Sequence, residues 1–571
     1  MNKLNSILKS RYWILAVILI LVLINIAASK WHARVDLTNE NRFTLSNSTK
    51  NILKNLQEPV EIEVFLKGNF PSGFKNLASS TNDILQEFRE IAGAKLRYSF
   101  ISPDEKIAGT DFTYSDSLPS LGLIPINLTS QIKEGQQQQF VYPFALVHYN
   151  DDVIPVTLYK GKTPIISFSE LSSSEAMLEY QFAEAIAKIT STEKSLIGFA
   201  TGNGEPMGDK VYDLVENILL PNYNLATFNL ESHPFIPKEF KVFMIVKPSI
   251  PFSEMEKLKL DQYVMNGGKL FMFIDKLDAE MDSLQIKNEV IAYDRELNLE
   301  DLLFKYGVRI NSDLVMDLQG DYLPFDVNGN GQYELLPWNY FPVIESKSNH
   351  PINKNLGFVS ARFVNSIDTV GSPEIKKTIL LSSSANSRTI GTPALISGKE
   401  NVMAPEDAKF NRSSIPMGVL LEGKFSSLFK NRLSSVMMDS LNSNGGTFIP
   451  QSIKENKIII VSDGDIVLND VVKGNQPIPM GMNPYTFGSQ REFPFANRDF
   501  VKNSLEYLID MSNLSESKSK DYTVRLLDTK RVNNEEQKWQ LINILIPAIF
   551  VILFGLIFQA IRKKKFTTGK I

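Results

Sequence analysis

Two short polar segments each follow a run of apolar residues and could place reactive groups at the edge of a sheet. The first follows SLIGFA and consists of Gly202, Asn203, Gly204 and Glu205. The second contains Asp463 and Asp465 and follows KIIIV. Doubly wound folds bind ligands where their strands end, and carboxylates there could bind a cation or transfer protons. The alternative is structural, because glycines permit tight turns and aspartates cap the next element.

Several catalytic chemistries are excluded by residues that the chain lacks. It has no cysteine, which removes disulfides, thiolate metal ligands and thiol nucleophiles. It contains no G-x-x-x-x-G-K-[ST] phosphate loop and no G-x-S-x-G elbow, and its four histidines have no metal-ligand spacing. We therefore expect no catalytic residue, no cofactor and no metal ligand. A hydrolase using Glu205, Asp463 and Asp465 stays open only if these carboxylates meet in one pocket.

Two hydrophobic segments near the ends of the chain predict membrane helices over residues 12–29 and 541–561. The second is followed at once by Arg562, Lys563, Lys564 and Lys565. Because basic flanks stay in the cytoplasm, this cluster predicts that the last helix runs from outside to inside. The first helix then runs the other way, unless it is a signal peptide that is cleaved.

Between these segments the sequence predicts an α/β protein of more than one domain, since 571 residues exceed the size of one core. Strand and helix patterns alternate, first as an α+β domain and then as a doubly wound α/β domain with near-continuous apolar strands. The expected boundaries are a cytoplasmic tail 1–11, an α+β domain 36–165, a helical linker 172–190, an α/β domain 195–515 with a strand-rich region at 308–450, a juxtamembrane segment 516–538 and a basic cytoplasmic tail 562–571.

Longer segments resemble one transporter family along nearly the whole chain. They are DLTNENRFTLSNSTKNILKNLQEPVEIEVFLKGNFPSGFKNL (36–77), LLPWNYFPV (335–343), IIIVSDGDIVLN (458–469) and NRDFVKNSLEYLID (497–510). These segments resemble the gliding-motility-associated ABC transporter auxiliary subunits of Bacteroidetes, the GldG family. The middle region is similar to the auxiliary domain of ABC-type transport systems and to the non-catalytic GIFT domain. In that wider group the turn often reads GHGE, whereas this chain has Asn203 in place of the histidine.

The resemblance implies a non-catalytic subunit in the bacterial inner membrane, with a large periplasmic domain and both termini cytoplasmic. Its expected partners are an ABC permease, a separate ATPase, membrane lipid and a periplasmic protein or glycan. Nucleic acid is not expected, because the net charge is only −4. The alternative function is a periplasmic receptor for a solute or glycan, which would need a cleft with converging polar groups.

Overall fold

The computed structural model divides into two compact units, residues 1–521 and 522–571. It describes residues 18–19, 21–22, 44–107, 109–132, 135–159, 166–191, 193–281, 284, 289–327, 330–346, 348–397, 407–472, 476–489, 491–509, 514 and 529–567. Nearly all of the expected first membrane segment, 12–29, and the beginning of the juxtamembrane segment lie outside the described residues.

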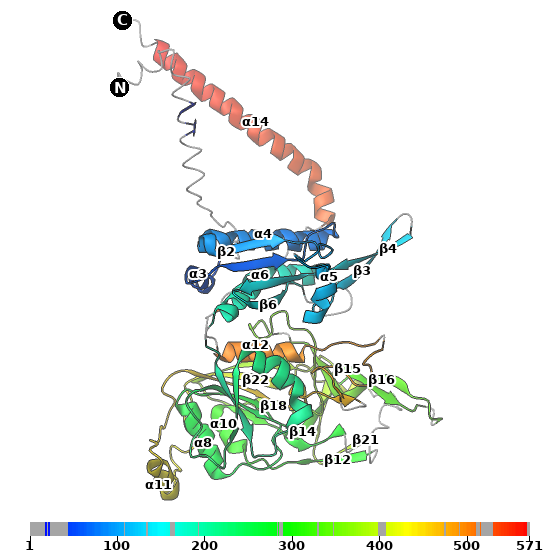
Figure 1. The fold of residues 1–571 in the computed structure, drawn as a ribbon, viewed down its shortest axis with the longest axis vertical. Coiled ribbons are helices and arrows are strands. Elements are labelled where there is room, and N and C mark those ends of the chain that lie inside the picture. The colour runs from blue at the N-terminus through cyan, green and yellow to red at the C-terminus, as the bar shows by residue number, and fades with distance from the viewer. Residues whose placement is uncertain are drawn as a thin grey trace. The chain divides into compact units, whose positions relative to one another are not determined.

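The first part of the large unit, here called the N-terminal module (residues 44–191), is built on a four-stranded sheet in the order β2-β1-β5-β6 (Figure 1). Its strands are β1 (Val60–Val64), β2 (Leu96–Phe100), β5 (Phe144–Tyr149) and β6 (Asp152–Thr157). The first two are parallel and joined by α4 (Ser72–Ala92), which confirms the expected β-α-β unit. Strand β5 is antiparallel to β1 and to β6.

Helices α3 (Asn47–Lys54) and α6 (Phe168–Thr190) complete this module, and β3 (Ile126–Ile132) and β4 (Gly135–Val141) form a hairpin. A capping box between Ser167 and Glu170 starts α6. Side chains of α6 such as Phe182 are fully buried in the same core as the sheet. The segment expected as a linker is therefore a packed element of the module.

The second part of the large unit, the sheet module (residues 193–509), contains a seven-stranded sheet in the order β19-β22-β23-β10-β9-β7-β8. Its parallel strands are β7 (Leu196–Thr201), β8 (Asn224–Asn229), β9 (Phe240–Val246), β10 (Lys269–Phe273) and β23 (Asn456–Val461). The antiparallel strands β22 (Pro416–Gly423) and β19 (Ile375–Ser382) extend one edge.

Alternate residues of the parallel strands enter two separate cores, one on each face of the sheet. Met244 and Ile459 pack on the face covered by α12 (Asn497–Ile509). Ile245 and Ile458 pack on the other face, with α8 (Glu254–Met265) and α10 (Glu300–Tyr306). Burial on both faces explains the near-continuous apolar strands and confirms the α/β class.

The strand-rich region expected at residues 308–450 is not a separate insertion into the α/β domain, because its strands β19 and β22 belong to the main sheet. The other strands of this region, together with β11 and β12 before it, form smaller sheets: β11 (Leu277–Asp278), β12 (Glu289–Asp294), β13 (Val308–Ile310), β14 (Asp313–Asp317), β15 (Gly320–Phe325), β16 (Glu334–Ile344), β17 (Val359–Ser360), β18 (Ile367–Thr369), β20 (Ser387–Gly391) and β21 (Ala394–Ser397). Trp338, which is fully buried, contacts the rings of Phe341 and Phe363 in their shared core.

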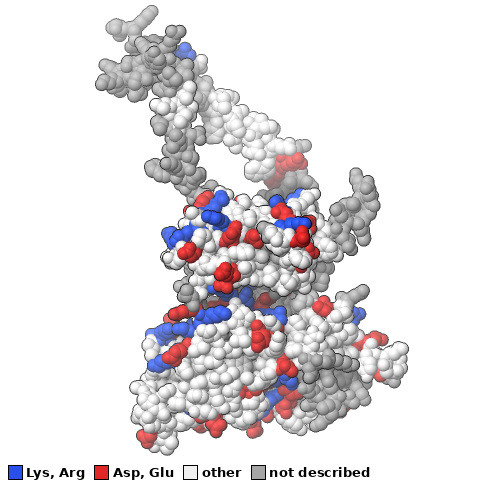
Figure 2. Space-filling view, in the orientation of Figure 1, with Lys and Arg blue, Asp and Glu red and all other residues white. Residues whose placement is uncertain are grey.

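Shorter elements connect these strands. They are α5 (Tyr114–Ser117), α7 (Leu220–Asn222), α11 (Ser435–Ser443), β24 (Val471–Val472), β25 (Gln476–Pro477), 3₁₀ turns at 93–95, 118–121, 208–211, 407–409 and 465–467, and a π-helix at Asp213–Leu219. The connection between β7 and β8 thus contains one 3₁₀ turn followed by a π-helix. On the visible face of the protein, Figure 2 shows acidic and basic side chains interspersed.

The small unit contains α14 (Thr529–Thr567), whose segment Lys538–Lys563 is long and apolar enough to cross a membrane. Its 26 residues exceed the roughly 20 needed to span the hydrocarbon layer. Figure 2 draws most of this helix without charged side chains. Among the described helices it is the one candidate span, and it includes the expected second membrane segment.

Candidate functional site

The carboxyl ends of β9, β10 and β23 bring charged residues from three distant parts of the sequence to one edge of the sheet. Lys247 follows β9, Asp275 follows β10, and Asp463 and Asp465 follow β23. The three strands are parallel neighbours, so their last residues lie side by side. This edge is where doubly wound folds bind their ligands.

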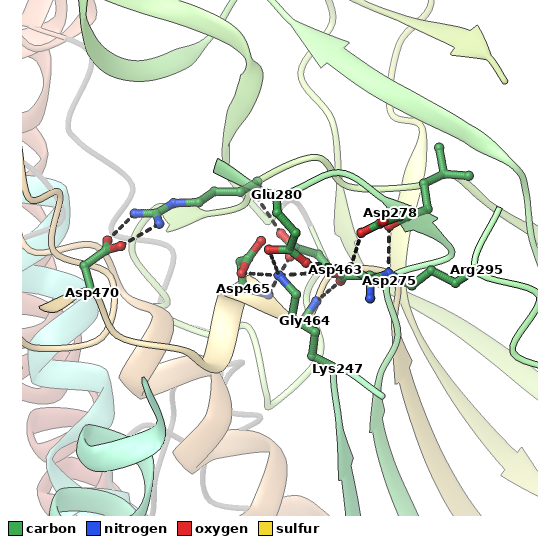
Figure 3. Close-up of polar contacts among 11 residues, drawn as sticks. Lys247, Asp275, Asp278, Glu280, Arg295, Asp463, Gly464, Asp465 and Asp470 are labelled. Atoms are coloured by element: carbon green, nitrogen blue, oxygen red, sulfur yellow. Dashed lines mark hydrogen bonds and ion pairs between the residues drawn. The ribbon is translucent and has the colours of Figure 1, made fainter. Parts of the chain in front are cut away.

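Lys247 lies at the centre of the group and is surrounded by carboxylates (Figure 3). Its Nζ lies 2.6 Å from Asp465 Oδ1, 3.1 Å from Asp275 Oδ2 and 3.1 Å from Glu280 Oε2. Only 8% of the Lys247 side chain is exposed. Burial opposes its charge, but the three carboxylates outweigh this effect and hold the pKa of Lys247 well above its ordinary value. The lysine is therefore a cation and not a nucleophile or base.

A second cation binds the outer side of Glu280. Arg295 Nη2 lies 2.5 Å from Glu280 Oε1 and 3.2 Å from Asp278 Oδ1, and its Nε donates to the carbonyl of Leu277. Burial raises the pKa of Glu280, and its two cationic neighbours counteract this effect. We call Lys247, Asp275, Glu280, Arg295, Asp463 and Asp465 the Lys247 cluster.

Asp463 is fully buried and uses both oxygens to hold backbone. Its Oδ1 accepts from the amide of Asp465 and its Oδ2 from the amide of Arg362, both at 2.7 Å. Burial raises its pKa well above the ordinary value, and Asp465 and Asp275 raise it further. The guanidinium of Arg362 forms two hydrogen bonds with Asp470. Asp463 thus has the role of an internal cap.

The backbone of this edge is shaped around the lysine. Lys247 has a φ of 45°, a left-handed conformation that is uncommon for a residue with a side chain. The aliphatic part of the Lys247 side chain packs directly against Gly464. A Cβ added to Gly464 would lie 2.5 Å from Lys247 Cβ. Gly464 also donates its amide to Asp275 Oδ1 at 2.5 Å. Strained backbone persists only where the surroundings enforce it, so the Lys247 position is firmly built into the fold.

The Lys247 cluster fills the crevice in which related sheets hold a ligand. Its cations and carboxylates are paired with one another and are largely excluded from water. A catalytic acid, base or nucleophile must instead reach a substrate. The arrangement therefore has the character of a structural ion network.

The turn formed by residues 202–205 packs against the loop after β9. The carbonyl of Asn203 accepts the amides of Ser249 and Ile250 at 2.8 and 2.9 Å, and the Asn203 amide donates to Glu205 Oε2 at 2.8 Å. Gly204 has a φ of 76°, and a Cβ on it would lie 2.1 Å from Ser249 Oγ. These contacts explain the glycines structurally, as the simpler interpretation of the sequence required.

Two acceptors of this turn have no hydrogen-bond partner in the part of the chain that the structure describes. They are Asn203 Oδ1 and Glu205 Oε1, and both side chains are more than nine-tenths buried. Burial raises the pKa of Glu205, its two backbone hydrogen bonds lower it, and Glu256 raises it further. The three carboxylates considered for a hydrolase have different partners: Glu205 accepts from the Asn203 amide, Asp465 pairs with Lys247, and Asp463 accepts from the amides of Asp465 and Arg362.

The structure thus brings together Asp463 and Asp465 and adds residues that sequence reasoning missed. Lys247 and Asp275 carried a usable signal, because each is the first charged residue after an apolar strand. Glu280 and Arg295 carried no such signal, because they lie in segments that connect strands. Among the described residues, no group of three or more His, Asp or Glu side chains is arranged to hold a metal ion.

Comparison with known proteins extends over both modules. A family model described as an ABC-type uncharacterized transport system matches residues 194–504, and a domain of unknown function matches residues 39–148. An uncharacterized protein of Borreliella burgdorferi is 22% identical over 583 aligned positions, with 99% of each chain covered. The solved mmIFT52 N-terminal domain aligns with 55% of this chain and 97% of its own length, at 13% identity and a TM-score of 0.30.

Proposed function

This chain belongs to the ABC-type uncharacterized transport system family, and from that premise we propose that it is a non-catalytic auxiliary subunit of an ABC transporter. One observation carries the non-catalytic assignment: the crevice at the carboxyl ends of β9, β10 and β23 is filled by the protein's own ion pairs. Lys247 lies at the strand ends where doubly wound folds bind ligands, at 2.6–3.1 Å from three carboxylates of the same chain. Hydrolysis of ATP is therefore assigned to a separate ATPase subunit.

We further propose that the chain is held in the bacterial inner membrane by α14 and by the expected span over residues 12–29. The basic residues 562–565 favour a cytoplasmic C-terminus. In this topology the N-terminal and sheet modules are periplasmic. They couple a permease, which contacts the membrane helices, to a periplasmic protein or glycan. The resemblance to the GldG family adds the proposal that the transporter serves gliding motility.

Purification of the intact, tagged chain from membranes in mild detergent tests the complex. We expect a multi-span permease and an ATPase to co-purify. The matched control replaces residues 541–561 by an unrelated apolar helix, which keeps an anchor but removes the surface for the permease. Absence of both partners from the intact chain would contradict the proposal.

The lack of cysteine allows a direct test of the topology. Thr568→Cys marks the basic tail and Asn442→Cys marks α11, where the native side chain is exposed. In intact spheroplasts, a membrane-impermeant maleimide is expected to label the thiol at position 442. The thiol at position 568 should react only after the membrane is opened. The reverse pattern would show the opposite orientation.

A second candidate function, a periplasmic receptor for a solute or glycan, is favoured by one observation. A cleft of about 880 Å³ lies between the two modules and is lined by polar side chains of both. Small-molecule sites commonly have volumes of about 300–1,000 Å³ and often lie between domains.

A further inference from the structure

The cleft between the modules opens at the edge of the main sheet opposite to the Lys247 cluster. One wall comes from α3, β6 and the end of α6, and includes Asn51 and Asp152. The other comes from the residues that precede β7 and β8, Ser195 and Tyr223, and from the end of α12. The cleft thus lies at the amino ends of β7 and β8, whereas the Lys247 cluster lies at the carboxyl ends of β9, β10 and β23.

Ion pairs between α6 and α12 form the floor of the cleft. Lys188 Nζ contacts Glu184 and lies 2.8 Å from Glu506 Oε1, and the Tyr180 hydroxyl donates to Glu506 Oε2 at 2.6 Å. Burial and the neighbouring Glu506 raise the pKa of Glu184, and Lys188 lowers it. Lys188, Glu184 and Tyr180 come from one module and Glu506 from the other, so the network joins the two walls of the cleft.

The charged side chains at the floor of the cleft already form ion pairs with one another, so they disfavour a charged ligand. A ligand carrying its own charge would lose hydration without gaining a free counter-charge at this depth. The remaining charged lining residues, Asp152, Glu193 and Lys194, are exposed at the rim. Ion pairs in water contribute little to binding.

The rest of the lining combines neutral hydrogen-bonding groups with apolar surface. The neutral polar members include Asn51, Asn55, Gln57, Thr190, Ser191 and Asn222. Asn51 and Asn55 are four residues apart at the end of α3 and lie on the same side. Ile52, Ile154 and Pro221 supply apolar surface between them. Gln57 and Asn222 each donate one amide N–H to a backbone carbonyl, and the hydroxyls of Thr190 and Ser191 donate to carbonyls as well. The second N–H of these amides, the side-chain carbonyl oxygens and the lone pairs of the hydroxyls remain for a ligand, which suits a ligand whose groups both donate and accept.

We propose that this cleft binds a neutral, hydroxyl-rich ligand of the size of a di- or trisaccharide. Ligand hydroxyls pair with the amide and hydroxyl side chains of α3, α6 and the segment before β8, while ligand C–H faces cover the apolar residues. The proposal rests on the second candidate function above and adds the position of the site and the ligand class. It does not depend on recovery of the permease complex.

A thiol placed in the cleft gives a direct measure of occupancy in this cysteine-free chain. Val153→Cys in the full-length protein introduces the thiol at an exposed apolar position of the lining and removes no hydrogen-bonding group. Asn442→Cys on α11, which is outside the cleft, is the control. The probes are maltotriose, cellotriose and diacetylchitobiose, with spermidine and citrate as charged comparisons. We expect at least one sugar to slow maleimide modification at position 153, about tenfold at ten times Kd, and to leave position 442 unchanged.

The possible results distinguish the proposed position of the ligand site from the receptor function itself. A sugar that raises the Tm of the unmodified chain but does not protect position 153 overturns the cleft and leaves the receptor function standing. If no sugar does either, both are overturned. Protection by spermidine or citrate alone overturns the neutral ligand class. Asn55→Trp, which fills part of the cleft from an exposed position, is expected to abolish both protection and the Tm shift.

Discussion

Replacement of Lys247 by methionine should destabilise the sheet module strongly, because it leaves a group of buried carboxylates without their central cation. At about 3 Å, each of the three ion pairs is worth roughly 5 kcal/mol at an effective dielectric constant of about 20. Much of this energy offsets the desolvation of the lysine. Removing one partner of a buried pair has a net cost of about 3–5 kcal/mol.

The loss should depend on pH. Burial raises the pKa of Asp275, Glu280 and Asp463, and Lys247 lowers all three. In Lys247→Met their folded-state pKa values rise further above the unfolded values. A carboxyl group whose pKa is higher in the folded than in the unfolded state stabilises the fold only while it is protonated. This contribution is fully present below the pKa of the unfolded state and is lost as pH rises through the pKa of the folded state. The variant should therefore lose more stability at pH 8 than at pH 5.

Thermal unfolding of the detergent-solubilised full chain measures this effect. At about 2 °C per kcal/mol for a large domain, the expected Tm decrease at pH 8 is about 6–10 °C. Lys241→Met is the matched control, because Lys241 lies on the same strand but is exposed. Equal losses for the two variants, or a Lys247→Met loss that is the same at pH 5 and pH 8, would refute the reasoning.

Three further predictions concern other parts of the chain. Gly464→Ala should cost about 1–3 kcal/mol in unfolding free energy, because its methyl group overlaps the Lys247 stem, whereas Gly371→Ala, with open space around it, should change stability by less than about 0.5 kcal/mol. Glu205→Gln should gain stability relative to the native chain as pH rises from 5 to 8 in paired urea titrations. The native Glu205 carboxyl has a raised pKa, so it must ionise while buried as pH rises, which the amide of the variant avoids. The same difference in unfolding free energy at pH 5 and pH 8 would contradict this explanation. A chain that lacks residues 538–571 should stay in the carbonate-washed membrane fraction, because the expected N-terminal span still anchors it. A chain that also lacks residues 1–29 should be released. Release of the first variant would disprove the N-terminal span.

The parallel strands of the sheet module could be predicted from the sequence because they are buried on both faces. Strands such as KVFMIV and KLFMF are nearly continuous apolar runs, and Ser253 with Glu256 marks the start of α8 as a capping box. Strand β8, NLATFN, lies at the edge of the sheet and is half exposed, so it carries no such signal. The positions of β19 and β22 could not be predicted, since their pairing is set by contacts with distant strands.

The candidate site was predictable only in part, for a related reason. Asp463 and Asp465 follow a strand and were placed correctly at a strand end. Their partners Glu280 and Arg295 reach Lys247 from connecting segments, whose course depends on tertiary packing. A sequence pattern reports local structure and cannot show that these residues converge on one lysine.

The pairing of β10 with β23 has a consequence for how the protein is made. Leu270 pairs with Ile458, so roughly 190 residues must be synthesised between the two halves of this contact. Until then β10 presents an unpaired apolar edge, which is a site for aggregation. The main sheet therefore closes only when β23 arrives, and a chain that ends before residue 456 leaves this edge of β10 open.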